Sequence, residues 1–351
     1  MIEILGFEPR ANYFSKPVIP KLDTDLLAIV IRMRKPLELP DTEIIRIANS
    51  RFGRSFVSLE FIPLGEASWL YRAAETDGAR FVIKIQHDVD AAPAEVLAQL
   101  AEATYSWVPQ SYFTKDSLLW AKEGDLYFSV QQYIPVDSLH HAASEPDTDF
   151  LHELGRALVE LHHRIPDISK LPHVRTEDFY PSVFNSAKQL INQLDSMASA
   201  ESNITRVQQV FKTQRENIDR LFANMVKYGA VLEKNSPKNV LVHGDTHFGN
   251  ILKPQDDHIY LIDWDHAMFA QPEMDLMYYT DEQIKIIGET YGRDLLENEE
   301  AVQYYRNFLL VRAIDFFLER LFDPRHASDE SIPESMEEIF NMSPYFKRAL
   351  Q

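Results

Sequence analysis

The chain has no cysteine among its 351 residues, and its apolar residues form no long runs. The absence of cysteine excludes disulfide bonds, zinc sites with thiolate ligands and cysteine nucleophiles. The longest early apolar run, Leu26 to Ile31, follows Asp23 and Asp25 and is shorter than the apolar core of a signal peptide. No run in the sequence approaches the roughly 18–20 apolar residues that cross a bilayer. We therefore expect a cytoplasmic protein without a membrane segment.

Positive charge is also scarce in this sequence. Lys and Arg together number 35 against 54 Asp and Glu, so the formal net charge is −19. A field of this sign repels the phosphates of nucleic acids and anionic lipid surfaces. It attracts small cations, although an acidic surface serves solubility just as well. The composition therefore argues against nucleic acid and membranes as partners and is compatible with a small cationic ligand.

The length predicts about two lobes, and the apolar pattern changes near residue 134. Short segments rich in aromatic and β-branched residues dominate before that point, and long amphipathic helices follow it. We expect an N-terminal extension over 1–38, a β-rich lobe over 39–133 and a helical lobe over 134–351, which together give an α+β fold. The predicted helices span 40–53, 94–104, 150–161 and 204–229, and the predicted strands span 56–63, 69–74, 81–85, 117–121, 126–133, 240–242, 251–253 and 259–262.

The densest group of polar residues follows the predicted strands at 240–242 and 259–262. Its members are His243, Asp245, His247, Asn250, Asp263, Asp265 and His266. Because both strands are apolar and are predicted to be buried, the polar residues beyond their ends emerge together at one edge. The sequence therefore predicts a polar site at this edge.

Three interpretations of this group compete. In the first, Asp245 orients and deprotonates a hydroxyl, while Asn250 and Asp263 hold Mg²⁺ on the phosphates of a nucleotide. The four residues between Asp245 and Asn250 match the spacing of that template. In the second, the histidines and aspartates bind the two metal ions of a hydrolase. In the third, they only pack a turn between strands.

The first interpretation requires a lysine on a central strand of the small sheet and a carboxylate on the next helix. Lys84 stands among the apolar residues of 81–85, where burying it without a partner would be costly. Glu95 is its predicted partner, unless Glu95 only favours the helix dipole, and Glu102 on the same helix is the other candidate. Gly65 and Ser68 lie in the preceding hairpin and can aim backbone N–H groups at phosphates, although an ordinary hairpin explains them equally well.

These motifs resemble the aminoglycoside phosphotransferase family of kinase-like enzymes. The resemblance rests on His-Gly-Asp and the following Asn at 243–250, on Ile-Asp-Trp-Asp at 262–265 and on Glu-Met-Asp-Leu at 273–276. Looser similarity at 154–162 and 132–134 extends it over about residues 40–320. Within the family, the segments at 270–277 and 304–306 are most similar to the spectinomycin phosphotransferases.

The resemblance implies a protein-kinase-like fold with two lobes. The small lobe is an antiparallel sheet with one helix that binds the nucleotide, and the larger lobe is mostly helical. The resemblance also implies that Asp245 is the catalytic base, that Asn250 and Asp263 bind Mg²⁺ and that Lys84 contacts the α- and β-phosphates. It further assigns the adenine to Gln132, Tyr133 and Ile134, and support of the catalytic loop to Asp275.

The implied reaction moves the γ-phosphoryl group of ATP, or of GTP, to a hydroxyl of a small cationic molecule, an aminoglycoside or aminocyclitol antibiotic such as spectinomycin. Asp265 and the i,i+4 pair Asp315 and Glu319 are candidates to bind its amino groups, unless the pair is only a solvated acidic face. The sequence departs from the spectinomycin-type pattern at Arg312 and Ala313. The alternatives are a kinase of a choline-, homoserine- or amino-sugar-like metabolite and a nucleotide-binding pseudokinase module.

Overall fold

The computed structural model describes residues 35–63, 68–87, 91–136, 146–164, 171–179, 181–198, 202–235, 239–254, 258–323, 331–341, 347 and 349. The predicted extension up to residue 34 and Gly65 lie outside the described residues. Within the described ranges, no helix combines the length and the apolar character needed to cross a membrane.

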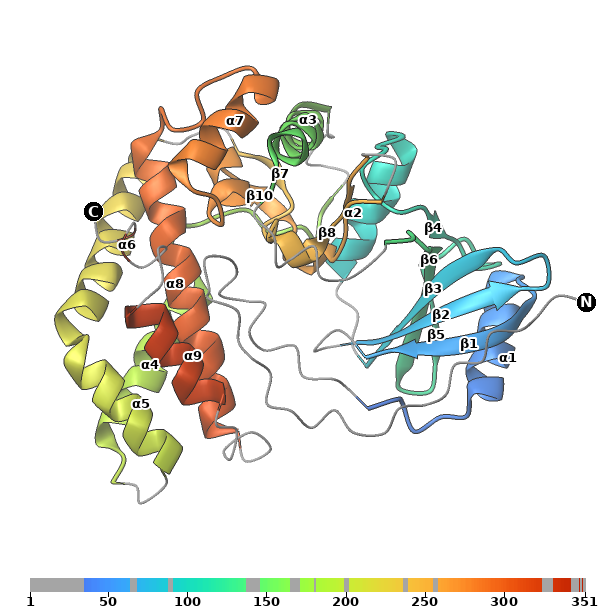
Figure 1. Ribbon diagram of the computed structural model, residues 1–351, viewed down its shortest axis with the longest axis horizontal. Helices are drawn as coiled ribbons and strands as arrows, with labels where there is room; N and C mark the ends of the chain where they lie inside the picture. Colours follow the sequence, from blue (N-terminus) through green and yellow to red (C-terminus); the bar gives the residue numbers. More distant parts are fainter. Residues whose placement is uncertain are drawn as a thin grey trace, which may run out of the picture.

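The small lobe is built on an antiparallel sheet with the strand order β1-β2-β3-β6-β4, in which β5 also pairs with β6 (Figure 1). The strand bounds are β1 Phe56–Ile62, β2 Trp69–Glu75, β3 Arg80–Gln86, β4 Ser111–Tyr112, β5 Trp120–Glu123 and β6 Leu126–Gln132. The strand predicted at 117–121 begins later, because Ser117 has a φ of 63° in a turn that the Thr114 N–H closes on the Leu118 carbonyl. The two-residue β4 is too short to leave a periodic signal.

Helix α1 (Asp41–Phe52) covers one face of this sheet. Its buried residues Ile44, Ile47, Ala48 and Phe52 repeat at helical spacing and join the core of the sheet. Asp41 and Glu43 in its first turn complement the positive end of the helix dipole. Gly53 ends the helix in the left-handed conformation with a φ of 64°, as the sequence predicts.

The second helix of this part of the chain, α2 (Ala91–Glu102), belongs to a different core. Val96, Leu97 and Leu100 are buried with residues of the helical lobe, whereas the apolar face of β3 is buried with α1. The larger apolar core therefore includes residues that precede 133 in the chain. Helix α2 thus connects the two lobes by packing into the core of the larger one.

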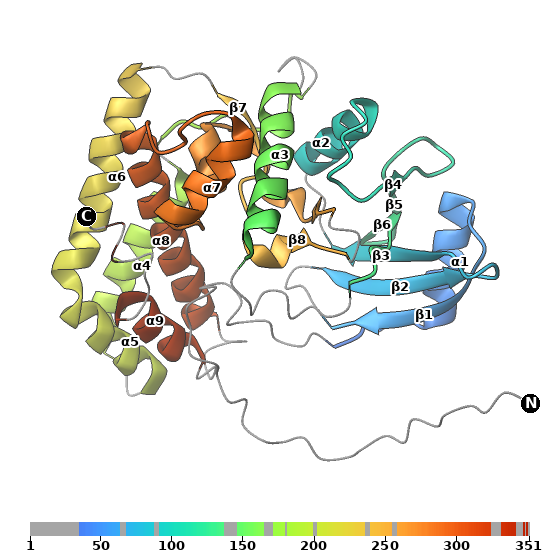
Figure 2. The ribbon, with the colours of Figure 1, turned by 45° about the horizontal axis from the view of Figure 1, so that its top comes forward.

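The larger lobe contains the helices α3 (Thr148–Arg164), α4 (Ser182–Ser196), α5 (Ser202–Thr213), α6 (Arg215–Asn235), α7 (Asp281–Tyr291), α8 (Glu299–Phe322) and α9 (Ser331–Asn341) (Figure 2). The single helix predicted over 204–229 is two helices that meet at Gln214. Its apolar stripe divides there because α5 packs against α9 and α6 packs against α8. The prediction also ends α6 too early, since Gly229 lies inside the helix, against the backbone of Phe179.

Two short antiparallel ladders carry the polar loops between the lobes. β7 (Val240–Val242) pairs with β10 (Met268–Ala270), and β8 (Ile251–Leu252) pairs with β9 (Tyr260–Leu261). The short 3-10 helices η4 (Phe248–Asn250), η5 (Trp264–His266) and η6 (Pro272–Leu276) follow β7, β9 and β10. The mixed α+β architecture with an antiparallel sheet and a helical lobe agrees with the sequence prediction.

Candidate active site

The loop that follows β7 is fixed by hydrogen bonds to Asp275 of η6. The fully buried Asp275 carboxylate accepts hydrogen bonds from the backbone N–H of His243 at 3.0 Å and of Gly244 at 2.7 Å. It also accepts one from His162 of α3 at 3.0 Å, and its own carbonyl accepts the Thr246 hydroxyl. These bonds satisfy donors that burial would otherwise leave without partners. Asp275 braces the loop, as the resemblance implied.

Gly244 lets this loop turn toward Asp245. Its φ is +78°, a conformation that residues with a side chain rarely adopt. A Cβ atom at this position would lie 2.4 Å from the carbonyl oxygen of His266. Only glycine fits between β7 and η5 here.

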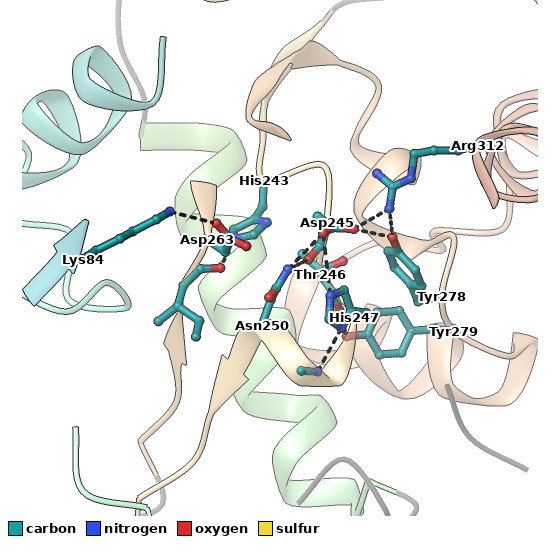
Figure 3. Close-up of polar contacts among 12 residues, drawn as sticks. Lys84, His243, Asp245, Thr246, His247, Asn250, Asp263, Tyr278, Tyr279 and Arg312 are labelled. Atoms are coloured by element: carbon teal, nitrogen blue, oxygen red, sulfur yellow. Dashed lines mark hydrogen bonds and ion pairs between the residues drawn. The ribbon is translucent and has the colours of Figure 1, made fainter. Parts of the chain in front are cut away.

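Asp245 is buried and lies at the centre of the group of polar residues predicted from the sequence (Figure 3). Its Oδ1 accepts hydrogen bonds from the Tyr278 hydroxyl and, at 2.5 Å, from Nη2 of Arg312. Its Oδ2 accepts one from Nδ2 of Asn250 at 3.0 Å. Burial is the largest influence and acts to raise the pKa of Asp245, but Arg312, His247, His266 and the Tyr278 hydroxyl together outweigh it and hold the pKa well below its usual range.

Two histidines flank this carboxylate. Nε2 of His247 lies 3.7 Å from Oδ2 of Asp245, while Nδ1 of the same ring accepts the N–H of Gly249. This bond places the proton of a neutral His247 on Nε2, the nitrogen nearer Asp245. Burial and the charge of Arg312 lower the pKa of both His247 and His266. Both rings are therefore held toward their neutral forms.

Asn250 is oriented by Asp245. Its Nδ2 donates to the Asp245 carbonyl at 2.9 Å as well as to the carboxylate. The amide nitrogen is therefore used in these two hydrogen bonds. The amide oxygen, which is the atom that can ligate a cation, is not used in them. The backbone of Asn250 accepts the N–H of Ile262 at 2.9 Å, which brings η4 next to Asp263. One amide oxygen and one carboxylate fit Mg²⁺, which prefers oxygen ligands and retains water or phosphate as further ligands.

Lys84 reaches across from β3 to the helical lobe. Its Nζ lies 3.3 Å from Oδ1 of Asp263 and 3.4 Å from Oδ2 of Asp265. Burial acts to lower the pKa of Lys84, but the two carboxylates raise it above its ordinary value. Asp263 itself has a left-handed backbone with a φ of 64°, an unusual conformation for a residue with a side chain.

The predicted pairing of Lys84 with Glu95 is corrected by the structure. Glu95 accepts hydrogen bonds from the backbone N–H and the ring of His173, whereas Lys84 pairs with the aspartates after β9. The sequence argument correctly required a carboxylate for a lysine on a buried strand. It selected the partner nearest in the chain, and the fold supplies one from the other lobe.

The remaining residues predicted for the nucleotide lie at opposite ends of the sheet, Ser68 just before β2 and Gln132, Tyr133 and Ile134 at the end of β6 and just after it. Ser68 is buried at the start of β2, and Ile134 is buried just after β6. The Gln132 side chain accepts the N–H of Gln110 at 3.2 Å, and the Tyr133 hydroxyl accepts Nη1 of Arg72 at 3.4 Å. The polar ends of both side chains thus form hydrogen bonds within the small lobe.

The carboxylates predicted for the acceptor lie in different places. Asp265 pairs with Lys84, on the side of the site predicted for the phosphates. Asp315 lies on α8 and forms a hydrogen bond with Ser186, while its Oδ1 is buried without a hydrogen bond. Glu319 is exposed one turn further along α8. Burial raises the pKa of both Asp315 and Glu319 above the ordinary values.

The sequence analysis missed Arg312 and Tyr278 as partners of Asp245. Arg312 was noted only as a departure from the family pattern, although it stands alone between Leu309 and Ile314 on an apolar helix. This is the signal that singled out Lys84, because an isolated charge among buried apolar residues needs a partner. Tyr278 carries no comparable signal.

The hydrolase interpretation gains no support from this geometry. No group of three or more His, Asp or Glu side chains among the described residues could hold a metal ion. Asp245 is instead occupied by Arg312 and Tyr278, and Lys84 is paired with Asp263 and Asp265. The number of histidines in the motif therefore does not indicate a metal site of the hydrolase type.

Comparison with known proteins agrees with this architecture. The chain is 27% identical over 250 residues to the protein StrN of Streptomyces griseus, covering 66% of this chain and 74% of StrN. Its fold resembles spectinomycin phosphotransferase APH(9)-Ia, solved in complex with ADP and spectinomycin, with a TM-score of 0.79, 20% identity and coverage of 89% of this chain and 98% of that one. It also resembles an ethanolamine kinase of Plasmodium vivax, with a TM-score of 0.58, 14% identity and coverage of 88% and 91%.

A family model described as the phosphotransferase enzyme family matches residues 58–306, which is more than half of the chain and includes Lys84, Asp245, Asn250 and Asp263. The chain belongs to this phosphotransferase enzyme family.

Proposed function

We propose that this chain transfers the γ-phosphoryl group of ATP to a hydroxyl of a small molecule. The observation that carries the proposal is the meeting of Lys84 from β3, Asp263 from the end of β9 and the Asp245–Asn250 pair from the loop after β7. These are the residue types that phosphoryl transfer requires at one place: a cation for the phosphates, metal ligands and a carboxylate for the hydroxyl.

In the proposed reaction, the acceptor oxygen attacks the γ-phosphorus, the bond to the β-phosphate oxygen breaks, and ADP leaves. Lys84 contacts the phosphates. Asn250 and Asp263 would hold Mg²⁺, whose charge would offset that of the phosphates. Asp245 orients the hydroxyl and receives its proton. Because Arg312, the neighbouring histidines and the Tyr278 hydroxyl together outweigh burial and hold the pKa of Asp245 low, Asp245 is a weak base. Positioning and electrostatics therefore supply most of the catalysis.

The proposed acceptor is an aminoglycoside or aminocyclitol, with spectinomycin as the first candidate, because a spectinomycin phosphotransferase is among the structures most similar to this chain. Asp315 lies one turn beyond Arg312 on α8 and is the carboxylate proposed to bind an amino group of such an acceptor. A metabolite kinase is the second candidate, because the ethanolamine kinase shares the fold. In either case the nucleotide is ATP or GTP.

The test measures ADP or GDP formation by the wild type and the Asp245→Asn variant with Mg²⁺ and a panel of aminoglycosides, aminocyclitols, choline-like amines and hydroxy-amino acids. We expect acceptor-stimulated turnover in the wild type and a loss of about 10²-fold or more in the variant. Nucleotide binding by the variant, followed as a rise in Tm, checks its fold. Turnover that survives in the variant, or its absence with every acceptor although nucleotide binds, would contradict the proposal.

A further inference from the structure

The two carboxylate oxygens of Asp245 differ in how many hydrogen bonds they already accept. Each oxygen of an ionised carboxylate offers about two lone-pair sites. Oδ1 accepts from the Tyr278 hydroxyl and from Nη2 of Arg312, so both of its sites are used. Among the described residues, only Nδ2 of Asn250 donates a hydrogen bond to Oδ2, at 3.0 Å (Figure 3). Oδ2 is therefore the oxygen that can accept a hydrogen bond from a bound hydroxyl.

His247 presents a proton donor beside this oxygen. Its Nδ1 accepts the N–H of Gly249 at 3.0 Å, so a neutral ring carries its proton on Nε2. Nε2 lies 3.7 Å from Oδ2 of Asp245, which is too far for a hydrogen bond. Within the part of the chain that the structure describes, Nε2 has no hydrogen-bond acceptor. A donor without a hydrogen bond thus lies next to an acceptor with a free site.

One hydroxyl oxygen can bridge these two groups. A hydrogen bond to Oδ2 is about 2.7 Å long and one from Nε2 is about 2.9 Å long, so both fit across the 3.7 Å that separates the two atoms. The side chains of His247 and Asp245 keep 18% and 11% of their surface exposed, so a small hydroxyl can reach both. The bound hydroxyl donates through its hydrogen and accepts through one lone pair. Its second lone pair remains for attack on phosphorus.

We propose that His247 is a catalytic residue whose Nε2–H donates a hydrogen bond to the acceptor oxygen, while the proton of that oxygen is donated to Oδ2 of Asp245. The inference rests on the proposed phosphotransferase function and deepens it by assigning a contact with the acceptor. As the O–P bond forms and the bond to the β-phosphate oxygen breaks, the acceptor proton moves to Oδ2, and His247 keeps its own proton. The two hydrogen bonds fix the direction of the attacking lone pair.

The competing role for His247 is purely structural. The ring caps η4 by accepting the N–H of Gly249, and this role needs only Nδ1. Two substitutions separate the two ring nitrogens. In His247→Asn the side-chain oxygen can still accept from Gly249, but no donor reaches the position of Nε2. In His247→Gln the longer amide can place an N–H near the position of Nε2, but the capping acceptor is lost.

The test measures kcat/KM for the acceptor of the panel above that the wild type phosphorylates fastest, at saturating Mg-ATP. We expect His247→Asn to lower it by about tenfold or more, because a donor to the reacting oxygen is lost, and His247→Gln to recover most of it. Tm and Kd for Mg-ATP check the fold of both variants. The control is His163→Asn, an exposed histidine of α3 whose ring also bonds to the backbone, and it should match the wild type.

The order of the two variants decides between the roles. A His247→Gln variant no more active than His247→Asn overturns the proposal, because capping alone then explains the effect of the residue. Absence of wild-type turnover with every acceptor would instead contradict the proposed phosphotransferase function, on which the inference rests. The two failures are therefore distinguished by the wild type.

A spectroscopic measurement tests the donor without turnover. Burial is the largest influence on the pKa of His247 and lowers it from the ordinary 6.5, so the ring is neutral at pH 8. Long-range ¹⁵N–¹H correlation spectra of the wild type with Mg-ADP at pH 8 show which ring nitrogen carries the proton, and the signal that His247→Asn lacks gives the assignment. We expect the Nε2–H form. The Nδ1–H form would overturn the inference even in a protein that transfers phosphate.

Discussion

At the scale of single residues, two isolated charges organise the site. Lys84 on β3 and Arg312 on α8 are each surrounded by apolar neighbours in the sequence, and each finds an aspartate of the central loops. The same physical rule, that a charge in an apolar segment needs a partner, applies to both. The rule shows that a partner exists but not which residue it is, because both partners come from distant parts of the chain.

Gly244 gives a residue-scale prediction with a matched control. Gly244→Ala introduces both the strain of a positive φ and a clash with the His266 carbonyl, whereas Gly78, with a φ of +87°, has open space around it. We expect Gly244→Ala to lower the free energy of unfolding by more than the roughly 1–2 kcal/mol of strain alone and to reduce turnover by at least about tenfold. Gly78→Ala should show only the strain. Urea unfolding and kcat measure both effects, and equal behaviour of the two variants would contradict the assigned role of the loop.

At the scale of elements, the sequence predicts a helix or strand well where its apolar face packs against one neighbouring element along its whole length. Helix α1 and strand β3 follow that rule, so their limits are predicted within two residues. The α5–α6 break is not predictable in this way, because the apolar period continues through Gln214 while the packing partner changes from α9 to α8. Helix α4, which the sequence analysis did not assign, packs against α8.

Asp147 gives a prediction at this scale because its carboxylate accepts the N–H of Phe150 at 2.7 Å at the start of α3. That hydrogen bond, opposed by slight burial and aided by Lys253, lowers the pKa of Asp147 below its ordinary 3.8. A lowered pKa in the folded state means that the stabilisation is present above the unfolded pKa and is lost as the pH falls through the folded value. We expect Asp147→Ala to cost about 1 kcal/mol at pH 7, and this cost should shrink below about pH 4.

Asp147→Asn separates the hydrogen bond from the charge. An asparagine oxygen also accepts the Phe150 N–H, so the stability difference between the Asn and Ala variants should not change with pH. Urea unfolding between pH 3 and 7 measures all three proteins. A cost of Asp147→Ala that stays constant down to pH 3 would show that the charge contributes nothing.

At the scale of the whole molecule, the site depends on contacts between the lobes. The sequence shows the motif proposed to be catalytic and the lysine, and the family resemblance implies that they act together. Their relative position in space is set by the fold. Lys84 bridges from the sheet to the loop after β9, and α2 shares the core of the helical lobe. Asp263 and Asp265 are about half exposed, so the bridging ion pairs contribute little to stability. They hold Lys84 at the place where the proposed reaction requires a cation for the phosphates.

Lys84→Met tests this relation between the lobes. Because a charge-assisted contact to phosphate is worth roughly 1.5–3 kcal/mol, we expect Kd for Mg-ATP to rise by about 10- to 100-fold while Tm changes little. Lys122→Met, on β5 with its ammonium over Tyr127, is the matched control and should bind Mg-ATP like the wild type. Calorimetric titration gives both values. Unchanged binding by Lys84→Met would remove Lys84 from the nucleotide site.

The most direct test of the central claim is to follow the label of γ-³²P-ATP into products separated by chromatography, with the wild type and Asp245→Asn at equal nucleotide saturation. We predict that the wild type places the label on the hydroxyl acceptor and that the variant transfers about 10²-fold less or lower still. Label found only in inorganic phosphate, or equal transfer by the two proteins, would contradict the claim that Asp245 directs phosphoryl transfer to a hydroxyl.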